Sequence, residues 1–93
     1  MRRKRAHPPI RLTVYGRAGC HLCEEAVVLL SRIGRRVKID LVEVDIDTED
    51  RLVAEYAIRI PVVVDTDTGA VVAEGAVDEA ALRATLRTIA QSR

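Results

Sequence analysis

The chain has two cysteines, Cys20 and Cys23, and only two residues separate them. This C-x-x-C spacing is typical of dithiol–disulfide redox sites, and cysteines with this spacing also serve as metal ligands. Cys20 lies where a helix would begin, so free backbone N–H groups and the positive end of the helix dipole would stabilise its thiolate. Cys23 follows one helical turn later and can reach Cys20 to form a disulfide. We therefore predict an exposed attacking thiol at Cys20 and a partly buried resolving thiol at Cys23.

Charged residues on both sides of Cys20 would change the pKa of its thiol in opposite directions. A free cysteine has a pKa near ~8.5, and cysteines in such positions fall to about 3.5–7.5. Arg17 and a protonated His21 would lower the pKa of Cys20, whereas Glu24 and Glu25 would raise it. We expect the pKa to be moderately lowered.

A strand and a helix are predicted to hold the two cysteines. Residues 10–15 alternate between apolar and polar side chains and are rich in β-branched types, which favours a strand. Gly19 lets the chain turn from this strand into the helix, and Gly34 is expected to end the helix. The apolar stripe of the helix comprises Leu22, Ala26, Leu29, Leu30 and Ile33.

The middle of the chain predicts a second strand and a short second helix. Residues 37–46 are apolar on both faces of a strand, which is typical of a strand inside a sheet that is covered on both sides. Thr48 is expected to cap the short helix, with Glu49 and Asp50 in its first turn.

The last third of the chain predicts a hairpin followed by a helix. Pro61 opens a strand over residues 62–64, residues 65–69 form a turn, and residues 70–74 form the returning strand. Asp78 is expected to cap the final helix. The predicted order β-α-β-α-β-β-α gives an α/β fold with a four-stranded mixed sheet and helices on both faces.

Charge divides the chain into a tail over residues 1–9 and a single domain over residues 10–93. Four basic residues occupy positions 2–5, whereas the other 89 residues carry 11 basic and 14 acidic side chains. A basic arm without interleaved aromatic residues is expected to be a flexible tail, so we expect no nucleic-acid partner. The sequence shows no apolar membrane span and no signal sequence, so we expect no membrane partner and a cytoplasmic location.

Metal binding is the main alternative use of the cysteine pair. A zinc site usually needs four ligands, and the sequence offers only His7 and His21 beside the two cysteines. A metal or cluster held between two chains could take one C-x-x-C from each. A metal or cluster carrier, or another non-catalytic binding module, is therefore the alternative to a redox enzyme.

The order of elements, with C-x-x-C after the first strand and a proline opening the third, resembles the thioredoxin superfold. Residues 12–26 are similar to the glutaredoxin-like family of bacteria and plants, whose motif is C-x-L-C. This resemblance implies that Cys20 is the nucleophile and Cys23 the resolving thiol. It also implies that Pro61 is a cis-proline beside the motif and that the backbone of Ile60 pairs with the extended substrate.

The same resemblance implies further substrate-binding positions. Arg17 stands where many glutaredoxins have a basic residue before the motif, and His21 lies inside the motif, where it would tune the thiol. Gly75 stands at the second position of the glutaredoxin Gly-Gly pair. Asp78 matches the acidic residue at a helix start that helps to hold the amino group of the substrate.

The expected function is that of a thiol–disulfide oxidoreductase acting on protein disulfides or on mixed disulfides of small thiols. The expected redox group is the Cys20–Cys23 disulfide itself, with no other cofactor. Glutathione or another low-molecular-weight thiol is the expected co-substrate. A separate reductant is expected to restore the dithiol of a monomeric protein.

Overall fold

The computed structural model describes residues 7–93, so the basic residues 2–5 of the expected tail lie outside the described part of the chain. This part forms four strands, three α-helices and a short 3₁₀ turn. The strands are β1 (Ile10–Gly16), β2 (Ile39–Asp45), β3 (Val62–Asp65) and β4 (Val71–Glu74). The helices are α1 (His21–Ile33), α2 (Asp50–Tyr56) and α3 (Glu79–Gln91), and the 3₁₀ turn η1 spans Ile46–Thr48.

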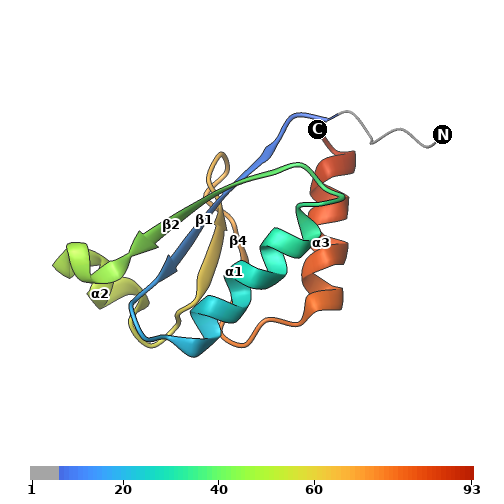
Figure 1. Cartoon of the computed structure of the whole chain (residues 1–93). Helices are drawn as coiled ribbons and strands as arrows, with labels where there is room; N and C mark the ends of the chain where they lie inside the picture. The colour runs from blue at the N-terminus through green and yellow to red at the C-terminus, as the bar shows by residue number, and fades with distance from the viewer. Residues whose placement is uncertain (1–6) are drawn as a thin grey trace.

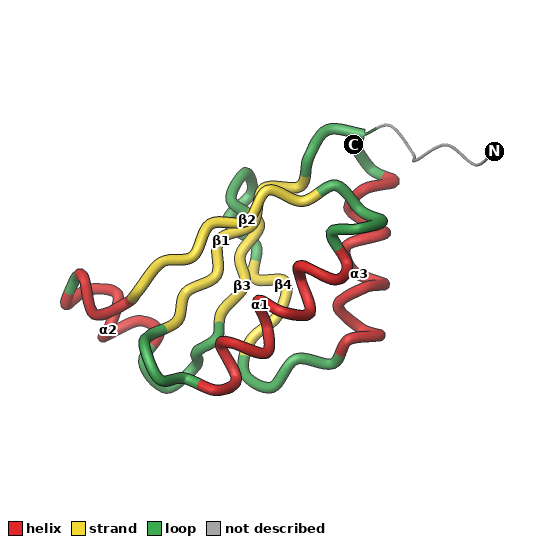
Figure 2. Tube along the Cα trace, viewed as in Figure 1, coloured by secondary structure: helices red, strands yellow, loops and turns green. Residues whose placement is uncertain are grey.

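The strands form one mixed sheet in the order β2-β1-β3-β4. β1 runs parallel to β2 and antiparallel to β3, and β3 and β4 form an antiparallel hairpin. Helices α1 and α3 lie side by side on one face of this sheet, whereas α2 lies beyond the end of β2 (Figures 1 and 2). The predicted four-stranded mixed sheet with three helices is confirmed.

The main core lies between the sheet and the two long helices. Alternate residues of β1 point into it, so Ile10, Leu12 and Val14 are buried while their neighbours face the other side. Branched aliphatic side chains make up nearly all of this core, because the chain has no Phe or Trp. The helices contribute Leu30 and Ile33 from α1 and Leu82, Leu86 and Ala90 from α3.

An aromatic pair joins α2 to the opposite face of the sheet. The ring of Tyr15, on β1, stacks on the ring of Tyr56, on α2, with centroids 4.3 Å apart. The guanidinium of Arg59 lies 5.4 Å from the centroid of the Tyr56 ring, in the geometry of a cation–π contact. α2 therefore contacts this face through Tyr56, at the end of β1 that leads to the cysteine pair.

The position of β2 differs from the prediction. We expected a strand covered on both faces, but β2 is an edge strand, and Val42 is 57% exposed. Ile39 and Leu41 still pack against the core, so the apolar pattern identified one face correctly. The pattern could not reveal that no helix covers the other face of this strand.

Two local predictions were also wrong. Thr48 does not cap α2, because it ends the η1 turn and donates its hydroxyl to the C=O of Asp45 at 2.7 Å. Glu49 takes the N-cap position of α2 without a side-chain hydrogen bond. Leu22 was assigned to the buried stripe of α1, but it is 40% exposed because Cys23 occupies the inward position of the first turn.

The described residues before β1 are attached to the domain from His7 onward. His7 is 9% exposed, and its Nε2 accepts a hydrogen bond from the N–H of Lys38 at 3.3 Å. Its Nδ1 then carries the proton and donates to the C=O of Pro8 at 2.8 Å. None of the helices within residues 7–93 has the length and apolar character needed to cross a membrane.

The C-terminal Arg93 pairs with a buried carboxylate. Asp65, at the end of β3, is 2% exposed, and its Oδ2 accepts a hydrogen bond from the Arg93 guanidinium. Its Oδ1 accepts the N–H of Asp67 at 3.0 Å and so fixes the turn between β3 and β4. Both oxygens of this buried carboxylate therefore have partners within the chain.

We expect Arg93→Ala to lower the free energy of unfolding by about 1–3 kcal/mol, because it leaves a buried charged group with an unsatisfied oxygen. Urea unfolding followed by circular dichroism measures this change. Arg87→Ala, at an exposed position of the same helix, is the matched control and should change the stability little. Equal stabilities for the two variants would show that the Asp65–Arg93 pair does not stabilise the fold.

Candidate functional site

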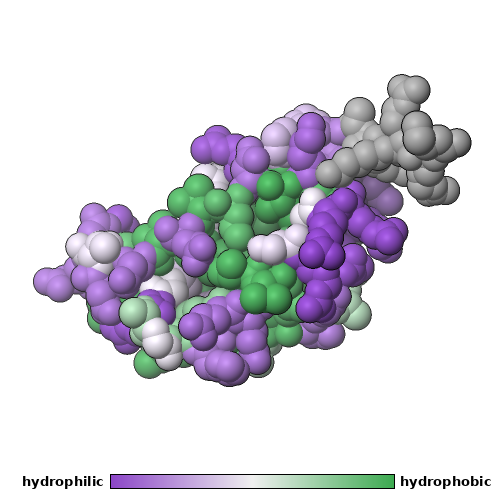
Figure 3. Space-filling view, viewed as in Figure 1, coloured by the Kyte–Doolittle hydropathy of each residue, from purple (hydrophilic) through white to green (hydrophobic). Residues whose placement is uncertain are grey.

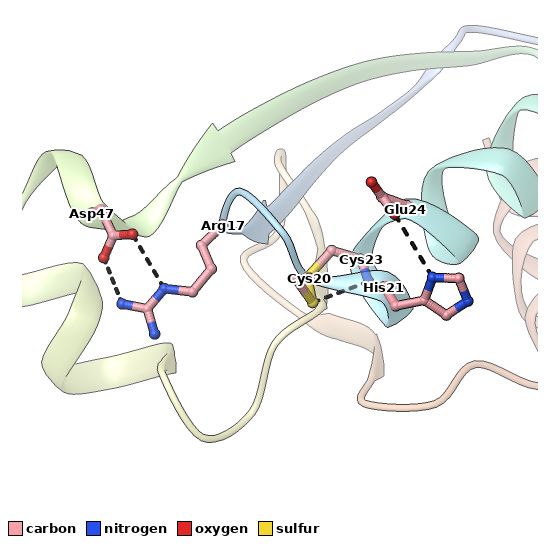
Figure 4. The surroundings of a disulfide bond; sticks show 6 residues. All are labelled: Arg17, Cys20, His21, Cys23, Glu24 and Asp47. Atoms are coloured by element: carbon pink, nitrogen blue, oxygen red, sulfur yellow. Dashed lines mark hydrogen bonds and ion pairs between the residues drawn. A yellow bond between two sulfur atoms is a disulfide. The ribbon is translucent and has the colours of Figure 1, made fainter.

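Cys20 and Cys23 form a disulfide at the N-terminus of α1 (Figure 4). Their Cα atoms are 5.2 Å apart. Cys20 is the N-cap residue, and its Sγ accepts a hydrogen bond from the N–H of Cys23 at 3.2 Å. Cys20 is half-buried, whereas Cys23 is only 8% exposed. The cysteine at the helix terminus is therefore the more accessible of the two, as predicted, although it is not fully exposed.

A tight turn connects β1 to this helix. The N–H of Cys20 donates to the C=O of Arg17 at 3.3 Å, and Gly19 has a φ of +76° at the third position of the turn. This is the pattern of a type II turn, which favours glycine at that position. The predicted role of Gly19 in the change of direction is confirmed.

Gly16, the last residue of β1, lies directly against Cys23. A Cβ atom built on Gly16 would be 3.0 Å from the Sγ and 3.1 Å from the Cβ of Cys23. Such distances are tighter than nine in ten Cβ contacts, so Cys23 would have to shift by a few tenths of an ångström. Because Gly16 has no side chain, the first turn of α1 can pack against the end of β1, with the sulfur of Cys23 in contact with Gly16.

The register of the sheet places Pro61 beside Gly16, near the cysteine pair. Tyr15 is opposite Val62 in the β1–β3 pair, so the next position along places Pro61 beside Gly16. The Ile60–Pro61 peptide bond is cis, and Pro61 is fully buried. The C=O of Pro61 accepts the N–H of Gly75 at 2.9 Å. Pro61 and Gly75 therefore lie together at the end of the sheet that holds the cysteines.

The loop before Pro61 is held by its own contacts. The N–H of Ile60 donates to the C=O of Tyr56 at 3.1 Å, so one polar group of the backbone that the resemblance pairs with the substrate has an internal partner. The Arg59 guanidinium donates to Glu74 at 3.1 and 3.3 Å and to Glu55 at 2.9 Å. The hydrogen bond to Glu74 raises the pKa of Arg59, and the same bond lowers the pKa of Glu74.

Arg17 turns away from the disulfide, toward Asp47 of the η1 turn (Figure 4). Its guanidinium donates to both carboxylate oxygens of Asp47, with the Nε–Oδ2 distance at 3.2 Å. These hydrogen bonds raise the pKa of Arg17 and lower the pKa of Asp47 below its ordinary value of 3.8. The positive charge expected beside Cys20 is thus matched by a carboxylate.

His21 points away from Cys20 and toward the carboxylates of its own helix (Figure 4). Its side chain is 83% exposed, with Nδ1 3.8 Å from Glu24 Oε2 and Nε2 3.4 Å from Glu25 Oε1. Asp78 is also exposed, and its carboxylate accepts the N–H of Ala80 at 3.2 Å as the N-cap of α3. The sequence identified Asp78 correctly as a cap.

Sequence reasoning missed two acidic residues at this site. Asp47 was not identified as a site residue, because its partner Arg17 lies 30 residues away in the chain. Glu43 was passed over within an apolar strand, yet it lies opposite Val14 in the β1–β2 register, on the side that faces α1. The sequence could have revealed Glu43, because it is a charged residue on the same side of the strand as the core residues Ile39 and Leu41.

A pocket of about 500 Å³ lies between α1, β1 and β2 beside the disulfide. It combines an apolar floor with charged walls, and Cys23 forms part of its lining. Within residues 7–93, no group of three or more His, Cys, Asp or Glu side chains is arranged to hold a metal ion.

Comparison with known proteins agrees with this geometry. Residues 11–87 match the family described as Glutaredoxin-like domain (DUF836). A Nitrosomonas europaea protein solved by NMR is 30% identical, with a TM-score of 0.76 over 88% of this chain and 96% of that one. An X-ray structure of an X. campestris protein is 35% identical, with a TM-score of 0.70 over 83% and 96% of the two chains.

A more distant match defines the fold. Thioredoxin 1 from Thermosipho africanus is 14% identical, with a TM-score of 0.64 over 88% of this chain and 96% of that one. At this identity the match shows the fold alone, so the chain has a thioredoxin-like α/β fold, as the sequence predicted. Comparison with the curated proteins found no match.

We expect Gly16→Ala to push Cys23 out of its packed position and to lower the free energy of unfolding by about 1–3 kcal/mol, as overpacking does. In the reduced protein, Cys23 should then be alkylated faster, which mass spectrometry of the modified peptides measures. Gly19→Ala is the control, since its positive φ costs about 1–2 kcal/mol but its Cβ would meet no atom within 4 Å. Similar Cys23 alkylation in both variants would contradict the packing argument.

We expect Asp47→Asn to release Arg17 and to lower the pKa of the Cys20 thiol. The rate of iodoacetamide alkylation against pH, in a Cys23→Ser background, measures this pKa. The double variant Arg17→Gln/Asp47→Asn removes both charges and should return the pKa close to its starting value. If the single and double variants titrate alike, Arg17 does not act on Cys20.

Proposed function

This chain belongs to the glutaredoxin-like family (DUF836), and on that basis we propose that it is a thiol–disulfide oxidoreductase that acts through Cys20 and Cys23. Its proposed substrates are disulfides of proteins or mixed disulfides of small thiols. Glutathione or another low-molecular-weight thiol is the proposed co-substrate, and a separate reductant restores the dithiol. We place the reaction in the cytoplasm, where such thiols are kept reduced.

The position of the Cys20 sulfur carries this proposal. Cys20 Sγ lies at the N-terminus of a helix of 13 residues and already accepts a backbone N–H at 3.2 Å. After reduction the same N–H and the helix dipole would stabilise a thiolate, which is the species that attacks a disulfide. Cys23 has no comparable environment, because it is buried against Gly16.

The first step of the proposed reaction forms a mixed disulfide. The Cys20 thiolate attacks one sulfur of the substrate, a Cys20–S–S–R bond forms, and the substrate S–S bond breaks. The leaving group departs as a thiolate and takes a proton from water. Cys20 is suited to this step because it is the more accessible cysteine.

The second step closes the protein disulfide. Cys23 loses its proton and attacks Cys20 Sγ, so the second half of the substrate leaves as a thiol and the protein dithiol is oxidised by two electrons. Within the first turn of α1 the two Cα atoms are 5.2 Å apart, which is within the usual range for a disulfide. The resolving step therefore requires no rearrangement of the helix.

We expect the reduced protein to consume bis(2-hydroxyethyl) disulfide, and Cys20→Ser to abolish this activity. Cys23→Ser should instead accumulate the Cys20 mixed disulfide, which intact-protein mass spectrometry detects. The pKa of Cys20, measured by alkylation rate against pH, should lie below the free value of ~8.5.

A pKa at or above the free value, together with no reaction with the disulfide, would contradict the proposed redox function. Metal analysis of the reduced protein then tests the metal-carrier alternative. Cys20-dependent disulfide reduction by protein that holds no metal would exclude a role as carrier alone.

A further inference from the structure

The pocket beside the disulfide has an apolar floor and charged walls. Val14 and Val27 provide its apolar floor, and the charged residues around it are mainly acidic. Figure 3 shows an apolar area on this side of the molecule, bordered by hydrophilic side chains. Its volume of about 500 Å³ lies within the range of pockets that hold small molecules. Because Cys23 is part of the lining, a group held here lies next to the sulfur atoms.

The carboxylates of this pocket are not balanced by the nearby arginine. Glu24, Glu43 and Asp45 line the pocket together with Arg17. Among residues 7–93, Arg17 is the only basic side chain of this lining, and its charge is matched by two hydrogen bonds to Asp47. The pocket therefore presents a negative potential beside the disulfide.

Glu43 has an unusual position for a charged residue. It lies on the core-facing side of β2, opposite Val14. Ile39 and Leu41, on the same side of the strand, pack against the core, whereas Glu43 follows them beyond the core. Its side chain is exposed, and within residues 7–93 it has no ion-pair partner. Glu43 thus directs an unpaired charge into the pocket from the strand across from α1.

Carboxylates also line the surface on the other side of α1. A second depression is lined by His21, Glu24 and Glu25, and Glu24 belongs to both depressions. The arginine of this depression, Arg32, is paired with Glu79 at 2.9 Å. A substrate that approaches the disulfide from either side of the first turn of α1 therefore meets carboxylates.

From these observations we propose that the site selects low-molecular-weight disulfides that carry a positively charged amine a few bonds from the sulfur. This inference rests on the proposed redox function and specifies its substrate class. The apolar floor accommodates the short carbon chain, and the carboxylates attract the ammonium group. Disulfides with net negative charge, including glutathione disulfide, are expected to be poor substrates, so of the proposed co-substrates this inference favours a low-molecular-weight thiol other than glutathione.

The reaction with such a substrate balances without a further component. The reduced protein and one molecule of the amine disulfide yield the Cys20–Cys23 disulfide and two molecules of the aminothiol. Two electrons pass from the protein dithiol to the substrate, and the two thiol protons of the protein finish on the released thiols at neutral pH. A single turnover of pre-reduced protein is therefore sufficient for the test.

The test compares three probes of similar length, namely cystamine (cationic), bis(2-hydroxyethyl) disulfide (neutral) and 3,3′-dithiodipropionate (anionic). The second-order rate of protein oxidation is measured by acid quenching and mass spectrometry. Each rate is divided by that of dithiothreitol with the same probe, because the probes differ in intrinsic reactivity. We expect a normalised preference for cystamine over the anionic probe on the order of tenfold at low salt.

Variants and salt identify the source of the preference. The double variant Glu24→Gln/Glu43→Gln should reduce the preference to about threefold or less, since it removes two of the charges near the sulfur atoms. Asp40→Asn, on the same strand but outside the pocket lining, is the matched control and should keep it. Raising the salt of the unmodified protein to about 0.3 M should also weaken the preference, because it screens exposed charges.

The neutral probe separates the two proposals. If it is reduced while cystamine has no normalised advantage over the anionic probe, the charge selectivity is wrong and the redox function stands. If none of the three probes is reduced, the redox function itself fails and the inference fails with it. A preference that survives both the double variant and high salt would also overturn the inference.

Discussion

The site depends on the close contact between Gly16 and Cys23. The sulfur of Cys23 occupies space that any side chain at Gly16 would fill, so the first turn of α1 rests directly on the end of β1. This contact buries Cys23 and leaves Cys20 at the accessible helix terminus. The β1–β3 register places Pro61 across the sheet from Gly16, so the proline lies at the same end of the sheet. The missing side chain of Gly16 thus makes room for Cys23 at the end of β1.

The loop that carries Pro61 is held from the other side by charge and aromatic contacts. Arg59 bonds Glu55 and Glu74, and it lies over Tyr56, whose ring stacks on Tyr15. The hydrogen bond from Arg59 lowers the pKa of Glu74 below its ordinary value of 4.5. The stabilising effect of this bond is therefore present above pH 4.5 and is lost as the pH falls through the lowered pKa. Solvent exposure of both partners keeps the effect small, so the loop is held by the combination of contacts.

The sequence predicted the elements well because each has a local cause. Alternating branched residues mark β1, and Gly19 and Asp78 fit the start of α1 and the cap of α3. Two of the failures have a different cause, since they depend on residues distant in the chain. The edge position of β2 and the pairing of Arg17 with Asp47 are properties of the assembled sheet. The disulfide partners were predictable, whereas the charges around them were not.

Charge at this site acts on the thiol and on the substrate together. The helix N-terminus favours a thiolate at Cys20, and the nearby carboxylates Glu24 and Glu43 oppose it. Their cost to the thiolate is limited because their side chains are exposed and water screens them. A cationic substrate would offset that cost as it approaches, because it brings positive charge to the carboxylates while its disulfide meets Cys20. The arrangement therefore links the reactivity of the thiol to the charge of what it attacks.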